Sequence, residues 1–223
     1  YENIVKLPNS CSGLKQLRIL DLSSTKIKEL PKWVCTLYNL QSLLLSKCKE
    51  LEELPANLRK LINLWCLDIS ETPLKKMPPQ IGRLINLQVL TAFVIGKDSG
   101  SMIKELGKLP MLRGKLFLSG LENVSSGRDA SLANMEGKKN FEKLTLKWNG
   151  DANNSQVARD VLDKLLPHSS IKQLKIDGYC GTTFPNWLGN SSLSYLESLN
   201  LSSCEYCFSL PALGQLGPFS HLK

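Results

Sequence analysis

Residues that could carry out chemistry are few in this sequence, and their spacing does not support an active site. The only two histidines, His168 and His221, lie far apart along the chain. Cys204 and Cys207 have the spacing of one zinc-binding pair, but a structural zinc site needs four ligands and no second pair is suitably spaced. We therefore expect neither an enzyme nor a metal site.

Two other patterns that can signal function are also incomplete. Asp21 and Asp68 occupy equivalent outward positions, but two coils of a repeat protein would hold them roughly 10 Å apart, at ~5 Å per coil, on an open face. The segment Gly96-Lys97-Asp98 has neither the spacing nor the terminal Ser or Thr of a phosphate-binding loop. No cofactor is therefore expected in this chain.

The elements that would position any functional residue are set by a repeated leucine pattern. Leu-x-x-Leu-x-Leu (or Ile), followed three residues later by Thr or Cys, begins at Leu17, Leu40 and Leu64. Each copy closes with Leu-Pro or Met-Pro, and the copies recur about every 24 residues, within the ~20–29-residue period of leucine-rich repeats. The pattern predicts an α/β solenoid, a right-handed leucine-rich-repeat horseshoe with a parallel β-sheet on its concave face. Short helices or irregular segments would form the convex face.

Positions of strands and helices follow from the pattern, because inward leucines alternate with outward residues along each strand. We expect strands near residues 17–22, 40–45, 64–69, 87–92, 115–118, 142–146, 172–176 and 197–201. We expect helical segments at 32–37, 129–136 and 156–166. Thr25, Cys48 and Thr72 follow the strands, and their side chains should hydrogen-bond the backbone of the next coil.

No linker divides the array, so residues 1–223 are expected to form a single leucine-rich-repeat domain, a fragment of a longer array. Regular repeats would cover 1–90, an irregular insert 91–114, and longer irregular repeats 115–223. The polar, turn-rich segment 151–155 is expected to be a mobile loop.

Composition limits the class of protein and its partners. Lys and Arg number 28 against 20 Asp and Glu, and the net charge of +8 favours acidic protein surfaces. The basic residues are scattered, so nucleic acid is not expected as a partner. No apolar run reaches the ~18 residues of a membrane span. The seven cysteines do not show the spacing of disulfide-stapled caps, which indicates a reduced, cytoplasmic setting.

A binding surface is expected on the outward residues of the strands, because parallel coils place them side by side on the concave face. Exposed aromatic side chains there would suit an interaction hot spot, although Trp148 could instead pack against neighbouring coils. The predicted partner-binding residues are Arg18, Asp21, Leu44, Trp65, Asp68, Phe117, Lys143, Thr145, Trp148, Lys172, Lys175 and Asn200.

The residues between the leucines resemble those of one family. The resemblance rests on Leu20-Asp21-Leu22-Ser23-Ser24-Thr25, Phe93-Val94-Ile95-Gly96, Leu112-Arg113-Gly114, Leu166-Pro167-His168, Gly178-Tyr179 and Cys204-x-x-Cys207. In these segments the chain resembles the leucine-rich-repeat region of plant intracellular disease resistance proteins with a coiled coil and a nucleotide-binding domain. The resistance-gene-analogue type is the most similar.

This resemblance implies that the repeat region folds back on the nucleotide-binding switch domain of the same protein and holds it inactive. It also implies recognition of a pathogen effector, directly or through a guarded host protein, which leads to hypersensitive cell death. ADP or ATP would bind the nucleotide-binding domain, which this chain lacks. The parent protein would be cytoplasmic, with nucleocytoplasmic or membrane-associated forms also open.

An alternative function is that of an extracellular leucine-rich-repeat receptor ectodomain that binds a peptide or protein ligand. Secreted plant repeats typically carry Gly-x-Ile-Pro at the turn, whereas this chain closes its repeats with Leu-Pro. The Asn-x-Ser/Thr sequons at Asn123, Asn153, Asn190 and Asn200 would matter only in a secreted protein.

Overall fold

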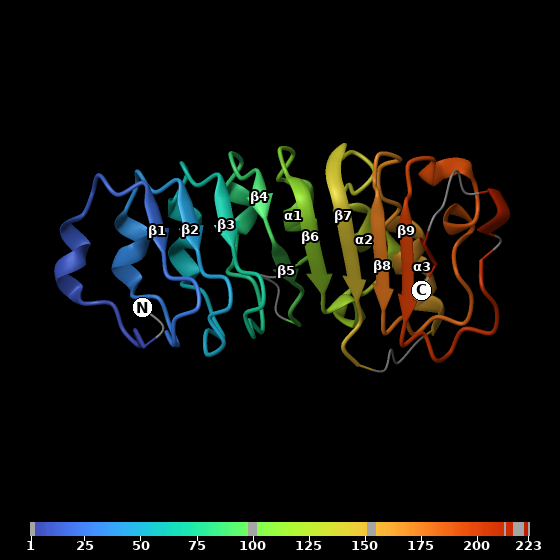
Figure 1. The fold of residues 1–223 in the computed structure, drawn as a ribbon, viewed down its shortest axis with the longest axis horizontal. Helices are drawn as coiled ribbons and strands as arrows, with labels where there is room; N and C mark the ends of the chain where they lie inside the picture. Colours follow the sequence, from blue (N-terminus) through green and yellow to red (C-terminus); the bar gives the residue numbers. More distant parts are fainter. Residues whose placement is uncertain (1–2, 98–101, 151–154, 212, 216–220, 223) are drawn as a thin grey trace. The chain divides into compact units, whose positions relative to one another are not determined.

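The computed structural model describes residues 3–97, 102–150, 155–211, 213–215 and 221–222 (Figure 1). The chain divides into two compact units, Tyr1–Leu112 and Arg113–Lys223. This boundary falls close to the end of the insert expected at 91–114, and a single domain over 1–223 stays a prediction. Of the predicted mobile loop, residues 151–154 lie outside the described residues.

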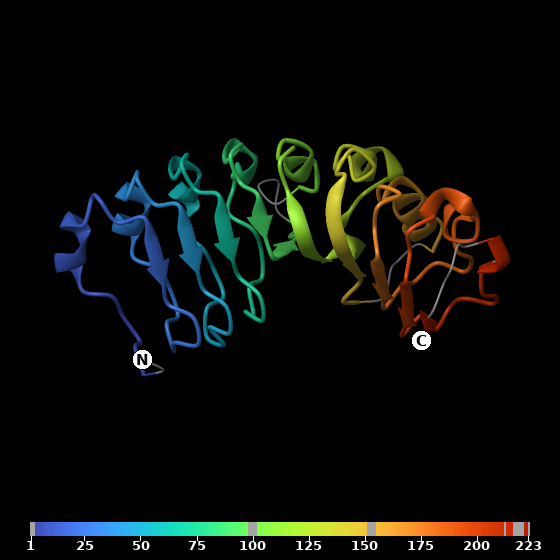
Figure 2. The same ribbon diagram turned by 45° about the horizontal axis from the view of Figure 1, so that its top comes forward.

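The first unit consists of coils that each contribute one short strand to a parallel sheet and one 3₁₀ helix behind it (Figure 1 and Figure 2). The strands, in sheet order, are β1 (Ile19–Asp21), β2 (Ser42–Leu44), β3 (Cys66–Asp68) and β4 (Val89–Leu90). The 3₁₀ helices are η1 (Asn9–Gly13), η2 (Lys32–Thr36), η3 (Ala56–Lys60) and η4 (Ile81–Arg83). The four strands expected in this region are confirmed, and the helical segment expected at 32–37 is η2.

The insert contains two elements that the leucine pattern did not predict, β5 (Ala92–Val94) and α1 (Lys104–Gly107). A buried carboxylate, Glu105, ties α1 to η4, because its Oε2 accepts a hydrogen bond from the backbone N–H of Gly82 (3.1 Å). Its Oε1 pairs with Lys108 at 2.6 Å, which satisfies the second oxygen.

Alternation along the strands builds the core of the first unit. Leu43, Leu45, Leu67 and Ile69 are each 0% exposed, whereas Leu44, which lies between two of them, is half-buried. Hydrophobic burial of each leucine contributes roughly 1.5–3 kcal/mol. The expected inward direction of these side chains is therefore confirmed.

A residue in the left-handed backbone region follows each of β1, β2 and β3. In the first unit these residues are Ser24, Lys47 and Glu71, with φ of 60°, 60° and 55°. This conformation costs roughly 1–2 kcal/mol for residues other than glycine. The geometry of the coil therefore imposes the turn, and no glycine marks it in the sequence.

Thr25, Cys48 and Thr72 follow these turns and are held by hydrogen bonds. Cys48 Sγ donates to the carbonyl of Leu22 in the preceding coil (3.1 Å). The hydroxyls of Thr25 and Thr72 donate within their own coils, to the carbonyls of Leu22 and Ile69 (both 2.8 Å). The predicted bond to the backbone of the next coil is therefore wrong for the two threonines, whose short side chains reach the carbonyl three residues back. Thr25 Oγ1 contacts the next coil through the side chain of Cys48, at 3.5 Å from Sγ. Cys48 does bond across coils, although to the preceding one.

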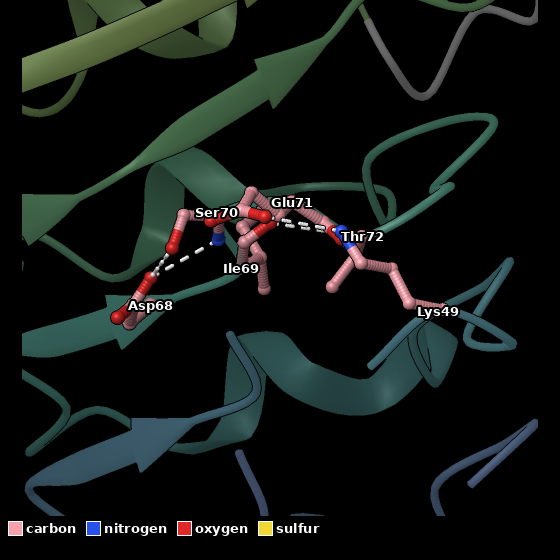
Figure 3. A network of polar contacts seen from close by, with 6 residues as sticks. All are labelled: Lys49, Asp68, Ile69, Ser70, Glu71 and Thr72. Carbon is pink, nitrogen blue, oxygen red and sulfur yellow. Dashed lines mark hydrogen bonds and ion pairs between the residues drawn. The ribbon is translucent and has the colours of Figure 1, made fainter. Parts of the chain in front are cut away.

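Contacts between successive coils repeat along both edges of the first sheet. At the strand-start edge, formed by the segments leading into the strands, the side-chain amides of three asparagines donate to carbonyls one coil earlier. These bonds are Asn39 to Lys15 (2.9 Å), Asn63 to Tyr38 (2.8 Å) and Asn86 to Ile62 (2.9 Å). At the strand-end edge, formed by the segments that follow the strands, the ion pairs are Lys28–Glu50, Lys49–Glu71, Lys75–Glu52 and Lys76–Glu53. Figure 3 shows the pair of Lys49 and Glu71.

The second unit contains the longer strands β6 to β9 and the α-helices α2 and α3. Its parallel strands are β6 (Arg113–Ser119), β7 (Asn140–Lys147), β8 (Gln173–Asp177), β9 (Ser198–Ser202) and β10 (His221–Leu222). Its helices are η6 (Leu121–Asn123), α2 (Gly127–Ser131), α3 (Ser155–Lys164), η7 (Asn186–Leu188), η8 (Ser191–Leu193) and η9 (Leu213–Gln215). The helix expected at 156–166 is confirmed as α3, whereas the helix expected at 129–136 begins two residues earlier and ends at Ser131. Every helix among the described residues is too short or too polar to cross a membrane.

An aromatic cluster fills the core of the second unit. The rings of Trp148 and Tyr179 meet edge to face at 5.2 Å, and Tyr179 stacks on Phe184 at 5.4 Å. The Tyr179 hydroxyl donates to the carbonyl of Thr183 (2.9 Å), so its polar end is satisfied inside the core. Burial, with smaller effects from nearby thiols and charges, raises the pKa of Tyr179 far above its ordinary value.

Candidate protein-interaction surface

The side chains that point away from the core on the strands form what we call the outer sheet face. In the first unit, Asp21, Leu44 and Asp68 lie opposite one another on β1, β2 and β3, as the residue spacing predicted. Asp21 is exposed, and Leu44 and Asp68 are half-buried. The row therefore places an acidic residue on either side of an apolar one.

Asp68 is held by a hydrogen-bond network within the sheet (Figure 3). Its Oδ1 accepts bonds from Ser70 N (3.0 Å), Ser70 Oγ (2.7 Å) and Thr91 Oγ1 (2.9 Å). Thr91 Oγ1 in turn accepts a bond from Ile69 N (2.9 Å), which links β3 to the end of β4. The carboxylate of Asp68 therefore stabilises the end of β3, and the exposed carboxylate of Asp21 is more available to a partner.

Arg18, Trp65 and Lys172 were predicted on the same face but lie just before their strands. The carbonyl of Arg18 accepts from Gln41 N (2.7 Å), and Trp65 N donates to the carbonyl of Gln41 (2.9 Å). Arg18 and Trp65 thus share one row at the strand-start edge, where Arg18 is exposed and Trp65 is 38% exposed. Lys172 occupies the equivalent place in the second unit, since its backbone bonds Glu142 and is bonded by Glu197.

In the second unit, the predicted row of Phe117, Thr145, Lys175 and Asn200 is in register across β6 to β9. Phe117 is 38% exposed, and Lys175 and Asn200 are half-buried. Thr145 is only 9% exposed, because the longer side chains of Phe117 and Lys175 flank it on either side. The expectation that Thr145 offers an exposed contact is therefore wrong.

Trp148 does not belong to the outer sheet face. It is 3% exposed and packs on Tyr179 in the aromatic core. The error has a simple cause, since Trp148 continues the alternation of Leu144 and Leu146, which point inward with the period of two. Its outward assignment is wrong, and the alternative of packing against neighbouring coils is confirmed.

Lysines dominate the outer sheet face of the second unit. Lys143 lies in register with Lys115 on the neighbouring strand, and both are exposed. Lys147 and Lys175 both pair with Asp177, at 3.7 Å and 3.4 Å. We had not predicted Lys115, Lys147 or Asp177, although the outward alternation through Phe117, Thr145 and Lys175 points to all three.

Asp177 is the carboxylate that pairs with Lys147 and Lys175. Burial acts to raise its pKa, but a hydrogen bond from Ser202 Oγ (2.7 Å) and the charges of Lys175 and Lys147 outweigh burial and lower the pKa below its ordinary value. Asp177 is therefore ionised at neutral pH and neutralises part of the lysine charge. The remaining positive charge, beside the ring of Phe117, suits an acidic protein surface.

The two cysteines with zinc-like spacing have structural contacts. Cys204 Sγ donates to the carbonyl of Ser202 (3.4 Å), and Cys207 Sγ donates to the carbonyl of Gly181 (3.1 Å). Burial, together with the nearby thiols of Cys204 and Cys180, raises the pKa of Cys207 to about 11. Within the described residues, no group of three or more His, Cys, Asp or Glu is arranged to hold a metal ion.

Similar proteins place this chain in a known family. The profile of the R13L1/DRL21 leucine-rich repeats matches residues 103–223, more than half of the chain, and a general leucine-rich-repeat profile matches residues 16–37. Two similar Arabidopsis thaliana proteins are named for disease resistance. At3g14460 is 49% identical over 100% of this chain, and the RPP13-like protein 1 is 44% identical over 94%. The chain spans only 16% and 21% of their lengths.

The fold itself is shared more widely. The leucine-rich-repeat ectodomain of the Arabidopsis receptor kinase HAESA matches 88% of this chain, and 31% of its own, with a TM-score of 0.52 and 21% identity. At that identity the likeness shows the fold alone. Together with the parallel sheets and the repeat spacing, these comparisons show a leucine-rich-repeat solenoid. The chain belongs to the R13L1/DRL21 leucine-rich-repeat family and is a leucine-rich-repeat region of the plant disease resistance type.

Proposed function

We propose that this chain is the sensor and inhibitory segment of a plant immune receptor and acts through protein contacts. It holds the nucleotide-binding switch domain of the same protein inactive. Binding of a pathogen effector, or of a host protein that the receptor guards, releases the switch and leads to defence and hypersensitive cell death. Similarity to proteins named for disease resistance over 94–100% of the chain supports this setting.

The proposal assigns the chemistry to the parts of a longer protein. ADP and ATP bind the switch domain, and this chain supplies an interaction surface without a catalytic role. The setting is the cytoplasm, where seven free thiols remain reduced.

The observation that carries the proposal is the basic outer sheet face of the second unit. Lys115 and Lys143 stand side by side, Lys175 lies in the next outward row, and Lys172 lies at the start of the same strand. Phe117, 38% exposed, supplies an aromatic anchor within this charge. We propose that an acidic surface of the switch domain docks here, while the exposed carboxylate of Asp21 in the first unit remains available to a second partner.

Co-immunoprecipitation tests this proposal directly. This segment and the nucleotide-binding domain of the full-length protein would be expressed separately in leaf tissue. The double substitution Lys172→Glu and Lys175→Glu should weaken their association at least tenfold, because it replaces attraction with repulsion at two basic residues of this surface. Arg128→Glu and Lys164→Glu, on α2 and α3, make the same change in net charge and should leave binding unchanged.

The possible outcomes distinguish a specific role of the sheet face from a general effect of net charge. Association that is equally sensitive to both double variants would reduce the effect to net charge and overturn the role of the sheet face. No association of the parent segment would overturn the inhibitory contact.

The alternative function, an extracellular receptor ectodomain, makes a different prediction. Its support from the HAESA ectodomain is a likeness of fold at 21% identity. Enzymatic deglycosylation of plant-expressed protein would shift its mass if the sequons were used, and that shift would favour the extracellular function over the one proposed here.

A further inference from the structure

A row of exposed apolar side chains runs along the strand-start edge of the first unit. Tyr38, Ile62 and Ile85 are 52%, 58% and 59% exposed. Each occupies the same position in its coil, immediately before the asparagine whose amide bonds the preceding coil. The asparagine bonds fix the backbone beside each side chain, so the three residues recur at the same edge of successive coils.

Trp65 extends this row with a second aromatic side chain. It is 38% exposed and stands at the start of β3, two residues after Asn63. Together the four side chains form an exposed apolar and aromatic strip at this edge of the sheet. Exposed apolar residues that recur at one edge mark a candidate interaction surface.

The charge along this edge has one sign. The segments from each Leu-Pro or Met-Pro closure to the next strand, residues 8–20, 31–43, 55–67 and 78–90, contain no Asp or Glu. Their cations are Lys15, Arg18, Lys32, Arg59, Lys60 and Arg83. None of the six forms an ion pair with any residue that the structure describes.

The strand-end edge, in contrast, contains both acidic and basic side chains. There, Glu50, Glu52, Glu53 and Glu71 each pair with a lysine of a neighbouring coil. At the strand-start edge, Lys15 Nζ donates to Thr36 Oγ1 (2.8 Å) and Arg83 donates to the side-chain oxygen of Gln80 (3.3 Å), both of which are neutral groups. Their charge therefore remains available to an external anion.

We propose that this edge is a peripheral membrane-binding surface for anionic lipid. We define the strand-start rim as Tyr38, Ile62, Trp65 and Ile85 together with Lys15, Arg18, Lys60 and Arg83. Apolar side chains inserted among acyl chains and cations held at anionic headgroups are the two contributions that bind proteins at a bilayer surface. Tyr and Trp are also the residues enriched at the membrane interface.

The geometry favours a membrane over an acidic protein partner. Parallel register repeats the apolar residues of the strand-start rim at the same edge of successive coils, so several of them can meet one planar surface together. An acidic protein could pair with the cations, but the exposed side chains of the rim also need an apolar phase, and a bilayer offers one directly beside its anionic headgroups. The strand-start rim has cations alone.

This inference is separate from the proposed function. The lysines of the outer sheet face in the second unit play no part in it, and Trp65, which was predicted as a partner contact, is left unchanged in the test. Loss of switch-domain binding and loss of lipid binding can therefore be told apart.

The test is sedimentation of the 223-residue chain with phosphatidylcholine vesicles, with and without phosphatidylserine. The parent protein should bind only the vesicles that contain phosphatidylserine. Lys60→Glu with Arg83→Glu should lower binding at least tenfold, since each basic residue near an anionic surface contributes about fivefold. Ile62→Ser with Ile85→Ser should lower it severalfold with no change in net charge.

The matched control is Lys26→Glu with Lys47→Glu at the strand-end edge, which makes the same change in net charge as the basic-residue variant. Its binding should stay close to that of the parent. An equal loss in this control, or full binding by both rim variants, would overturn the proposal. Failure of the parent protein to bind the vesicles would also overturn the proposal, even if the rim variants lost binding to an acidic protein. A thermal melt of each variant separates loss of binding from loss of fold.

Discussion

At the scale of single residues, glycines in the left-handed region differ in how much space surrounds them. Gly178 has φ of +68°, and a Cβ on it would lie 2.5 Å from the carbonyl oxygen of Trp148. Gly114 has φ of +81° with open space around it. Gly178 is thus required by both conformation and packing, and Gly114 by conformation alone.

We expect Gly178→Ala to lower the free energy of unfolding by roughly 3 kcal/mol or more, and Gly114→Ala by roughly 1–2 kcal/mol. The difference between the variants measures the collision of the added methyl group with the Trp148 carbonyl. Urea denaturation of the two variants and the parent gives both values. Equal losses would show that the backbone beside Trp148 yields to the methyl group.

At the scale of strands, Asp177 links three neighbouring elements of the second sheet. It pairs with Lys147 on β7 and Lys175 on β8, and accepts a hydrogen bond from Ser202 on β9. Its pKa lies below its ordinary value in the folded protein, so the unfolded chain binds a proton more readily than the folded one. The resulting stabilisation is present above about pH 4 and is lost as the pH falls through the folded pKa.

Asp177→Asn should therefore be less stable than the parent at neutral pH, and the two should converge as the pH falls below about 4. The measurement is the free energy of unfolding in urea at a series of pH values. Ser202→Ala removes one of the three favourable contacts and should show a smaller difference with the same pH dependence. A difference that stays constant through the acid range would contradict the assigned cause.

The asparagine contacts of the first unit offer a second test at this scale. Asn63→Ala removes the hydrogen bond to the Tyr38 carbonyl (2.8 Å) and should cost about 1 kcal/mol. Gln41 is also exposed at the strand-start edge, but its bonds to Trp65 and Cys66 use its backbone carbonyl. Gln41→Ala should therefore cost less. Thermal denaturation compares the two, and an equal loss would remove the special role of the asparagine.

Leucine spacing predicts the strands because alternation is a local property that each strand repeats. It does not predict β5 or α1, where leucines no longer recur with the coil period. The same alternation, followed strictly, would have placed Trp148 inside the core. Thr145 could not be assigned from its own strand, because its burial depends on neighbouring strands.

At the scale of the whole molecule, the repeat architecture implies that a destabilising substitution affects mainly its own coil and the adjacent coils. Leu43 is fully buried between coils, and Leu43→Asp places an unpaired carboxylate there at a cost of several kcal/mol. Hydrogen exchange should increase in β1 to β4 and remain near the parent level in β6 to β9, since each coil contacts mainly its neighbours. Leu44→Asp, on the outer sheet face, should change exchange little. Uniform exchange throughout the chain would indicate one cooperative unit.

The contacts between coils join residues that are one repeat apart in sequence, as in the bonds of Asn39, Asn63 and Asn86. Removing or adding one whole repeat therefore leaves each remaining coil with an equivalent neighbour. Deleting a single residue shifts every later contact of that coil out of place. Unequal recombination between gene segments for neighbouring coils can thus lengthen or shorten the array and still encode a chain that folds, which gives this architecture a ready route to new binding surfaces.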